Sequence, residues 1–353
     1  MPDAKDTATR RAAPSPAAEP PLTAAGGARI TPPPWLAPVV LGVVLVGLLV
    51  TARVVDLGTL SLLTTMLMVL AVAQGWNLLG GYGGYLNLGM AAFFGTGAYT
   101  AAILFDRFDT PMAVSLLPAG LVAALLALLV GLPSLRLRGA YFAILTLVLG
   151  FLVQAYALVS SLTRGALGIY LVAPGGSPRS SEQIFFHSFL ALATLAVVIA
   201  IVVQRSKLGY ALRAIREDED AAEVLGVRTM RVKLTALLLG AALAGMAGAL
   251  YAFRVSYLEP TGTFDISLSI DVVLMCVIGG AGSWQGPIIG VPLVLALSEV
   301  LRVGFQRVEI FGASVPIESN RVVLGLVLVL VALFARRGIV GLFRRAGGRR
   351  FGV

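Results

Sequence analysis

Charged side chains are scarce in this sequence, and histidine and cysteine are almost missing. Only 13% of the 353 residues are Asp, Glu, Lys or Arg, and the chain has one histidine, His187, and one cysteine, Cys276. A single cysteine excludes a disulfide within the chain, and this inventory cannot build a His/Cys metal cluster. A Ser/His/Asp catalytic constellation has no support, because the one histidine stands near the start of an apolar run. We therefore expect no catalytic residue, no metal site and no cofactor.

The phosphate-binding pattern Gly-x-x-x-x-Gly-Lys-(Ser/Thr) is also absent from the sequence. Without it, the chain does not cradle nucleotide phosphates by that route. The net charge is +9, but the basic residues stand beside apolar runs. We therefore interpret them as setting the orientation of the chain in a lipid bilayer, and we do not expect nucleic acid as a partner.

Long apolar runs dominate what is present, and 58% of the residues are hydrophobic. A run of about twenty residues spans roughly 30 Å of hydrocarbon, and a soluble core cannot bury so many such runs. Lipid forces backbone polar groups to pair within their own segment, which favours helices. The alternating ten-residue strands of a β-barrel do not occur. The sequence predicts an all-α polytopic membrane protein with about ten transmembrane helices, two of them short.

Eight of the predicted spans are clear runs between more polar connections. They are 36–54, 59–79, 86–105, 112–132, 139–159, 184–203, 234–253 and 320–335. Two shorter runs, 266–278 and 287–301, are joined by a glycine-rich stretch. At about 1.5 Å per residue neither crosses the bilayer comfortably, so they are either two short spans or a broken re-entrant pair.

The pattern divides the chain into three regions. Residues 1–34 hold eight of the eighteen prolines and predict a disordered cytoplasmic tail without the layout of a cleaved signal. Residues 35–335 form the transmembrane domain, with a cytoplasmic loop at 204–233, and residues 336–353 form a basic cytoplasmic tail. With the N-terminus inside, 19 of the 27 Lys and Arg residues fall on the cytoplasmic side. The positive-inside rule therefore places both termini in the cytoplasm.

The cytoplasmic loop contains a dense charged stretch, RAIREDEDAAEVLGVRTMRVKL, at 213–234. Asp220, followed three residues later by Glu223, has the spacing of a capping box, and Gly226 suits the left-handed position after a helix end. The stretch therefore predicts a short helix over 221–225. Two interpretations stay open: a helix that docks small apolar residues into a partner's groove, or a solvated loop that anchors two spans.

Four stretches follow one another in a recognisable order. They are GYGGYLNLGMAAFFGTGAYTAA at 81–102, LRLRGAYFAILTLVLG at 135–150, SKLGYALRAIREDEDAAEVLGV at 206–227 and IGGAGSWQGPIIG at 278–290. In this order they resemble the signatures of bacterial ATP-binding-cassette (ABC) importer permeases for branched-chain amino acids, the LivM-type subunit. The resemblance covers about 57–335, most of the chain.

The resemblance implies a non-enzymatic permease subunit of the bacterial inner membrane that moves branched-chain or related hydrophobic amino acids inward by alternating access. Its partners would be a second permease subunit, in this family a paralogue, two cytoplasmic ATPase subunits and a periplasmic substrate-binding protein. The short helix would couple the chain to an ATPase by sitting in its cleft. The residues that carry this expectation are Arg216, Glu217, Glu219, Asp220, Ala221, Ala222, Glu223, Leu225 and Gly226.

The sequence departs from that family at 84–90, where relatives commonly have Gly-Gln-Leu-Ser-Leu-Gly-His and this chain has GYLNLGM. Tyr82, Tyr85, Asn87 and Gly89 are therefore our candidates for the substrate pathway. The alternative for Tyr85 and Asn87 is packing and hydrogen bonding between helices.

The same departure leaves other cargoes open. The same machine importing urea or short amides is one alternative. A stand-alone secondary carrier is an alternative of a different class, and the short broken pair of apolar runs keeps it open. It would need no docking helix and would use an intramembrane acid such as Asp271.

A motif of small residues, AALAGMAGALYA at 241–252, places Ala241, Gly245, Gly248 and Ala252 at small-x-x-x-small spacing. This spacing permits close approach of helices. It predicts tight packing within the bundle or at a subunit interface.

Overall fold

The computed structural model describes residues 47–48, 51–306, 309–310 and 313–314, with side chains as far as Leu301. Its contacts divide the chain into two units, Met1–Leu48 and Leu49–Val353, and the fold below is that of the second. The predicted regions that lie outside the described residues are 1–34, most of 36–54, 320–335 and 336–353.

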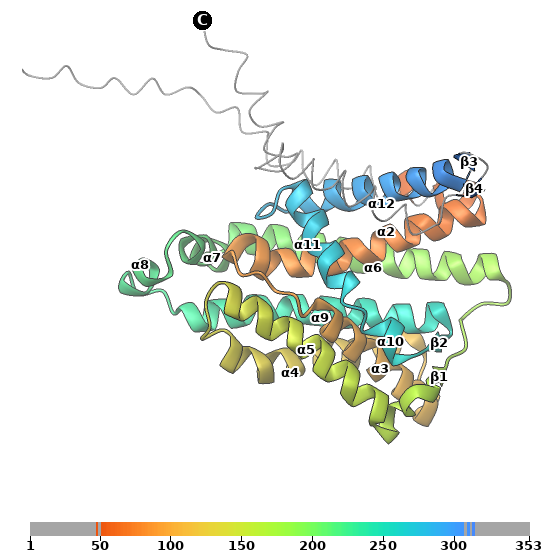
Figure 1. Cartoon of the computed structure of the whole chain (residues 1–353), viewed down its shortest axis with the longest axis horizontal. Coiled ribbons are helices and arrows are strands. Elements are labelled where there is room, and N and C mark those ends of the chain that lie inside the picture. The colour runs from red at the N-terminus through yellow and green to blue at the C-terminus, as the bar shows by residue number, and fades with distance from the viewer. Residues whose placement is uncertain (1–46, 49–50, 307–308, 311–312, 315–353) are drawn as a thin grey trace, which may run out of the picture. The chain divides into compact units, whose positions relative to one another are not determined.

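Helices follow one another along almost all of the described chain (Figure 1). The longer ones are α2 (Leu57–Trp76), α3 (Met90–Phe108), α4 (Met112–Ser134), α5 (Ala140–Val159), α6 (Pro178–Arg205), α7 (Lys207–Glu217), α9 (Thr229–Val255), α11 (Ser267–Gly279) and α12 (Gln285–Gln306). The shorter ones are α8 (Glu219–Val224), α10 (Pro260–Thr263), the π-helical η1 (Asn77–Gly81) and the 3-10 turns η2 (Ser161–Thr163) and η3 (Gly165–Leu167). The strands form two antiparallel pairs, β1 (Ile169–Tyr170) with β2 (Tyr257–Leu258) and β3 (Glu309–Ile310) with β4 (Ala313–Ser314).

Six helical segments of the described chain are long and apolar enough to cross a membrane. They are Leu57–Gly81, Met112–Ser134, Ala140–Val159, Pro178–Arg205, Thr229–Val255 and Pro260–Gly279. The first five match predicted spans, and the sixth contains the short run 266–278. The helical fold is therefore confirmed, with six candidate membrane spans among the described residues. The total of about ten spans stays a prediction.

The predicted span 86–105 starts too early. Residues 84–89, just before α3, are not helical: Gly84 has a φ of 74°, and the side chain of Asn87 accepts a hydrogen bond from the Gly89 N–H at 2.8 Å. This local turn competes with the helix, so α3 begins only at Met90. The helix is not among the six segments above, and it packs against α9 and α4.

Helix α9 is the most buried of the six spans and packs against α2, α3, α4 and α6. Its glycines let neighbouring backbones approach closely. A Cβ on Gly248 would lie 1.9 Å from the carbonyl oxygen of Phe94 in α3, and one on Gly97 in α3 would lie 2.1 Å from that of Gly245. The small-residue motif therefore serves packing within the chain, as one of the two interpretations predicted.

The two short apolar runs form a helical hairpin of α11 and α12 around the glycine-rich turn 280–284. Gly279 and Gly286 bring the two backbones together, since a Cβ on Gly279 would lie 1.9 Å from the Gly286 carbonyl oxygen. Helix α12 has 22 residues, which correspond to about 33 Å, so it is longer than the predicted run 287–301. Helix α11 has 13 residues, or about 20 Å, and gains length only through α10.

The two ends of α9 lie at opposite ends of the bundle, one beside α8 and the other beside β2 (Figure 1). At the β2 end, Arg254 forms an ion pair with Glu182 of α6 at 2.9 Å and donates to Ser61 and Thr65 of α2. Both charged side chains of the pair are 13% exposed. These contacts join α2, α6 and α9 at this end.

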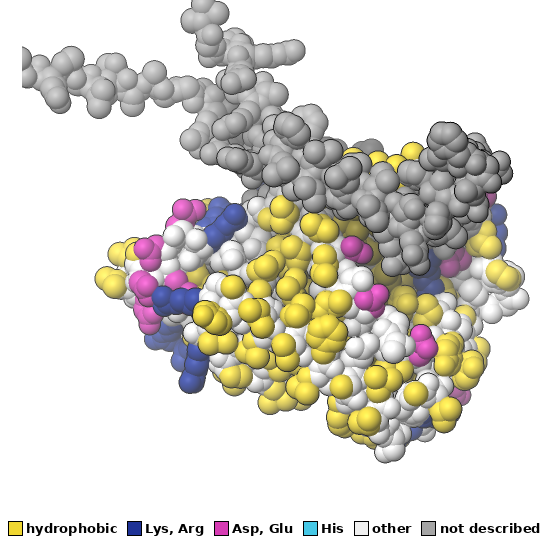
Figure 2. Space-filling view, viewed as in Figure 1, with side chains coloured by type: hydrophobic (Ala, Val, Ile, Leu, Met, Phe, Trp, Pro, Cys, Tyr) yellow, Lys and Arg dark blue, Asp and Glu magenta, His cyan; other side chains and the backbone are white. Residues whose placement is uncertain are grey.

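Hydrophobic side chains cover a broad band of the visible surface, while charged side chains gather around α7 and α8 (Figure 2). Helices α4 and α5 expose large apolar residues such as Leu117, Leu121 and Leu152. An apolar band of this kind suits lipid or another hydrophobic partner. The charged end suits water, so α8 lies on the aqueous side of the band.

Candidate functional site: α8 and its charge cluster

Helix α8 begins two residues earlier than the sequence predicts. Its N-cap is Asp218, whose side chain accepts a hydrogen bond from the Ala221 N–H at 2.9 Å. The predicted cap, Asp220, lies in the first turn with Glu219. The run of four acids at 217–220 offers several caps. Asp218 takes the role because the backbone is extended there, just after α7 ends at Glu217.

The predicted end of the helix is confirmed. Gly226 has a φ of 88° and donates its N–H to the carbonyl of Glu223 at 2.9 Å. The next N–H, that of Val227, reaches the carbonyl of Ala222 at 3.0 Å. These two hydrogen bonds form a Schellman motif, which satisfies the last carbonyls of a helix of only six residues.

The apolar side chains of this short helix point in two directions. Ala222 is 2% exposed and so is buried inside this chain. Val224 and Leu225 are 88% and 83% exposed. We call these two side chains the exposed tip of α8. The helix is capped at both ends, and an exposed hydrophobic surface of this kind suits contact with a partner.

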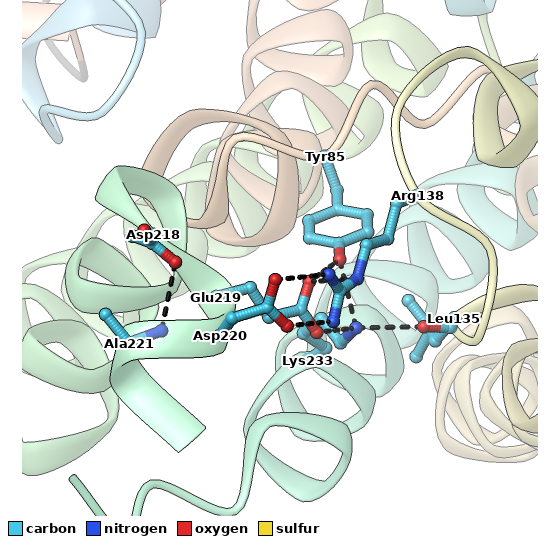
Figure 3. Close-up of polar contacts among 8 residues, drawn as sticks. All are labelled: Tyr85, Leu135, Arg138, Asp218, Glu219, Asp220, Ala221 and Lys233. Carbon is cyan, nitrogen blue, oxygen red and sulfur yellow. Dashed lines mark hydrogen bonds and ion pairs between the residues drawn. The ribbon is translucent and has the colours of Figure 1, made fainter. Parts of the chain in front are cut away.

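Five charged or hydroxyl side chains hold α8 to the bundle, and we call them the α8 cluster: Tyr85, Arg138, Glu219, Asp220 and Lys233 (Figure 3). They come from four places in the chain: the connection 82–89, the start of α5, α8 itself and the first turns of α9. Glu219 pairs with Lys233 at 2.6 Å and accepts a hydrogen bond from the Tyr85 hydroxyl. Its side chain is 12% exposed, and that of Lys233 is 3% exposed.

The ammonium group of Lys233 is fully satisfied. It donates to Glu219, to the Tyr85 hydroxyl at 3.0 Å and to the carbonyl of Leu135 at 2.8 Å. An ammonium has three N–H donors, so each has a partner. The same nitrogen lies 4.7 Å from the centre of the Tyr85 ring, a cation–π distance. The buried Lys233 side chain therefore leaves no N–H donor unpaired.

The outer part of the cluster is open to water. Arg138 makes two hydrogen bonds to the carboxylate of Asp220, at 2.8 and 2.9 Å, in the parallel arrangement that guanidinium and carboxylate favour. It also lies 3.6 Å from Glu219. The side chains of Arg138 and Asp220 are 54% and 74% exposed. Solvent therefore screens this pair, and the buried pair of Glu219 and Lys233 is the stronger attachment.

The cluster sets the protonation states of its members. Burial alone would raise the pKa of Glu219, but the hydrogen bonds from Lys233 and Tyr85, with the charges of Lys233 and Arg138, lower that pKa overall. The hydrogen bonds and charge of Arg138 lower the pKa of Asp220. Burial and the hydrogen bond to Glu219 raise the pKa of Tyr85. At neutral pH both acids are charged and the tyrosine is a neutral donor.

Arg216 joins α7 to the glycine-rich turn between α11 and α12. Its guanidinium donates to the carbonyl of Gly81 at 2.8 Å, and a Cβ on Gly282 would lie 2.7 Å from one of its nitrogens. The turn is also held by Asn77, whose side chain donates to the Ser283 carbonyl at 3.0 Å. Hydrogen bonds thus connect α7 to η1 and η1 to the turn between α11 and α12.

A cavity of about 520 Å³ opens beside the cluster. Trp76 and Tyr85 contribute aromatic lining, Arg138, Arg216 and Glu219 contribute charges, and the remaining lining is glycine and aliphatic. The cavity lies where η1, α7, α8 and the turn after α11 meet.

The other predicted pathway residues are buried and bonded within the chain. Tyr82 is fully buried, and its hydroxyl donates to Gln204 of α6 at 3.1 Å. Asn87 is 2% exposed, and its carbonyl accepts from the Trp76 ring at 2.8 Å. Gly89 precedes α3 and packs against Thr146. The structure thus brings the Tyr85 side chain to α8, while the Tyr82 hydroxyl contacts α6.

Sequence reasoning missed three residues of this site. Lys233 and Arg138 were counted only for orientation, and Val224 was not singled out. Lys233 directly precedes the predicted span 234–253, and only the helix start at Thr229 places it inside α9, where a buried charge needs a partner. Its partner Glu219 is fourteen residues away across a change of helix direction, and only the fold reveals that the two meet.

Comparison with known proteins gives a consistent set of relatives. The family model described as branched-chain amino acid transport system / permease component matches residues 58–332. The high-affinity branched-chain amino acid transport system permease protein LivM of Escherichia coli K12 is 32% identical over 331 residues, covering 85% of this chain and 75% of its own. The LivH permease protein of the same strain is 32% identical over 45% of this chain and 46% of its own. The guanosine ABC transporter permease protein NupP of Bacillus subtilis is 25% identical over 75% of this chain and 78% of its own. No solved structure matches the chain at the same level of significance.

Proposed function

The chain belongs to the family of branched-chain amino acid transport permeases, and from that premise we propose that it is a transmembrane subunit of an ABC importer that docks on a partner ATPase through α8. Alternating access driven by ATP hydrolysed on the partner chains moves the cargo inward. The observation that carries the proposal is the exposed tip of Val224 and Leu225 on a capped helix that the α8 cluster attaches to the bundle.

The charge distribution supports a cytoplasmic location for α8. Charged side chains gather around α7 and α8 at one end of the apolar band (Figure 2). By the positive-inside rule, this end faces the cytoplasm of a bacterial inner membrane. With 36–54, α3, α12 and 320–335 added to the six apolar segments, the count reaches about ten spans with both termini inside.

The proposed assembly follows from the names of the relatives. One relative is a LivM and another a LivH permease protein of the same organism, so we propose a paralogous second permease as the partner in the membrane. Two ATPase subunits on the cytoplasmic side and a periplasmic binding protein complete the machine. The ATPases supply the phosphate-binding motif that this sequence lacks.

Branched-chain or related hydrophobic amino acids are the proposed cargo. This follows from the LivM relative, which covers most of the chain. The relative named for guanosine transport shows that a permease of similar sequence is associated with a different cargo. Urea or short amides remain the alternative within the same machine, and uptake of leucine, urea and amides by the reconstituted importer separates these cargoes.

Docking is tested by placing a charge on the exposed tip. We expect Leu225→Asp to reduce recovery of the partner ATPase with the purified permease at least tenfold, because the carboxylate cannot be buried in an apolar cleft without a partner. Leu167→Asp is the matched control, since Leu167 is 81% exposed at the far end of the bundle. ATPase recovery equal to wild type with Leu225→Asp would reject the docking role of α8.

A stand-alone carrier predicts a different outcome. Its uptake would persist without any ATPase and collapse when the proton gradient is removed. We expect the opposite: uptake that requires the ATPases and survives loss of the gradient.

A further inference from the structure

We propose that Lys233 and Tyr85 are positioning residues for transport: they make α8, the start of α9 and the connection 82–89 move as one body. The inference rests on the proposed docking of α8 and names the residues that deliver its displacement to the membrane helices. Neither residue touches the exposed tip formed by Val224 and Leu225. Both act through Glu219.

The covalent connection alone does not hold α8 to α9. Only 225–228 separate the two helices, and that segment contains Gly226 in a left-handed conformation. Glycine rotates more freely than any other residue, so a helix of six residues attached there would swing. The pair of Glu219 and Lys233 closes a ring across this segment at 2.6 Å. A force on the α8 tip therefore pushes α9 instead of bending the connection.

The second attachment runs through Tyr85. Its hydroxyl accepts from Lys233 and donates to Glu219, which are complementary roles for a phenol. Its ring meets that of Phe142 in α5 edge-on, with centroids 5.3 Å apart. Tyr85 therefore connects α8 with the segment that leads from η1 into α3 and with the start of α5.

Because Lys233 and Glu219 are largely buried, water cannot replace their contacts with each other. Lys233 is 3% exposed, so its charge has no water to replace a lost partner. Replacing both partners by neutral residues of similar volume leaves no unpaired charge, whereas removing one partner alone does. This difference lets an experiment separate coupling from folding.

Helix α9 suits the role of receiving the movement. It lies at the centre of the bundle and packs against α2, α3, α4 and α6. Its other end is fixed by the Arg254–Glu182 ion pair, twenty-one residues and about 32 Å from Lys233. A displacement applied at Lys233 therefore reaches several spans through one helix.

The test uses the complete importer in liposomes and measures cargo moved per ATP hydrolysed, together with ATPase binding and thermal stability. The double variant Glu219→Gln with Lys233→Met removes both charges. We expect ATPase binding within about twofold of wild type and cargo per ATP reduced at least tenfold. Lys233→Arg keeps the charge and should retain most of the coupling. A merely structural role would instead lower stability and leave cargo per ATP unchanged.

Two further variants keep the test decisive. Tyr85→Phe removes only the hydroxyl and should reduce cargo per ATP about threefold. It provides the test if the double variant does not fold. Glu182→Gln removes the buried partner at the other end of α9 and should lower stability without changing cargo per ATP. Unchanged cargo per ATP in both the double variant and Tyr85→Phe would overturn the inference while α8 docking stands. Loss of ATPase binding in the double variant would also overturn it, because the cluster would then only support docking.

Discussion

Lys233 in the first turns of α9 and Glu219 in the first turn of α8 form a buried ion pair at 2.6 Å. The pair lies on the inner side of a helix whose tip is open to solvent. Attachment and exposure therefore occur on opposite sides of one six-residue helix. This arrangement suits an element that receives a force on one side and transmits it from the other.

Removing the lysine alone should destabilise the protein. In Lys233→Met the carboxylate of Glu219 keeps its charge but loses its nearest cation in a site with little water. We expect a loss of about 3 kcal/mol in the free energy of unfolding, measured by thermal unfolding in detergent. Adding Glu219→Gln should restore part of that loss. A double variant less stable than Lys233→Met would show that the charges do not act as a pair.

Attachment of α8 should depend on pH in the acid range. The pKa of Glu219 in the folded protein is below its ordinary value of 4.5, so the carboxylate stabilises the attached state. That contribution is fully present above pH 4.5 and is lost as the pH falls through the lowered pKa of the folded state. Amide hydrogen exchange of α8, corrected for intrinsic rate, should therefore stay slow from pH 7 down to the ordinary value of 4.5 and become faster only as the pH falls below it.

The control for this pH dependence is Glu219→Gln. It should show fast corrected exchange in α8 throughout the range, including at neutral pH. Equal corrected exchange of α8 in wild type and in Glu219→Gln at pH 7 would contradict the role of Glu219.

The caps of α8 give a third prediction. Asp218→Ala should cost about 1 kcal/mol of helix stability, because the Ala221 N–H loses its acceptor. Asp218→Asn keeps a side-chain oxygen and should be nearly neutral. Hydrogen exchange of the first α8 amides measures both. If Asp220→Ala instead produced the loss at the helix start, the assignment of Asp218 as the cap would be wrong.

Close backbone packing gives a fourth prediction. Gly248→Ala places a Cβ 1.9 Å from the Phe94 carbonyl oxygen, so α9 and α3 must separate. We expect a loss of about 3 kcal/mol or a failure to accumulate in the membrane. Gly176→Ala is the control, because nothing lies within 4 Å of a Cβ there. Equal expression and melting temperature of the two variants would contradict the packing of α9 on α3.

Much of the helical fold was predictable because spans of apolar residues have the length of a bilayer. The boundaries were less so where local polar chemistry intervenes. The Asn87 side chain delays α3 to Met90, and the four successive acids before Ala221 hide which one caps α8. These errors of two to four residues come from competing hydrogen bonds that hydropathy does not record.

The site itself was predictable only in part. Gly226 correctly predicted the end of α8, because the residue after the helix end adopts a left-handed conformation there. The meeting of Tyr85, Arg138 and Lys233 around Glu219 was not predictable, since these residues belong to segments far apart in the chain. Ala222 and Leu225 were expected to act alike, yet one is buried in this chain and the other is exposed.

The most direct test of the account asks whether the α8 tip touches the ATPase. The chain has one cysteine, Cys276, so Cys276→Ala gives a background in which Leu225→Cys is the single site for a thiol-reactive photocrosslinker. In the assembled importer, we expect light to produce a covalent permease–ATPase product from Leu225→Cys and none from Leu167→Cys. An active importer that yields no such product from Leu225→Cys would contradict the claim that α8 is the docking helix.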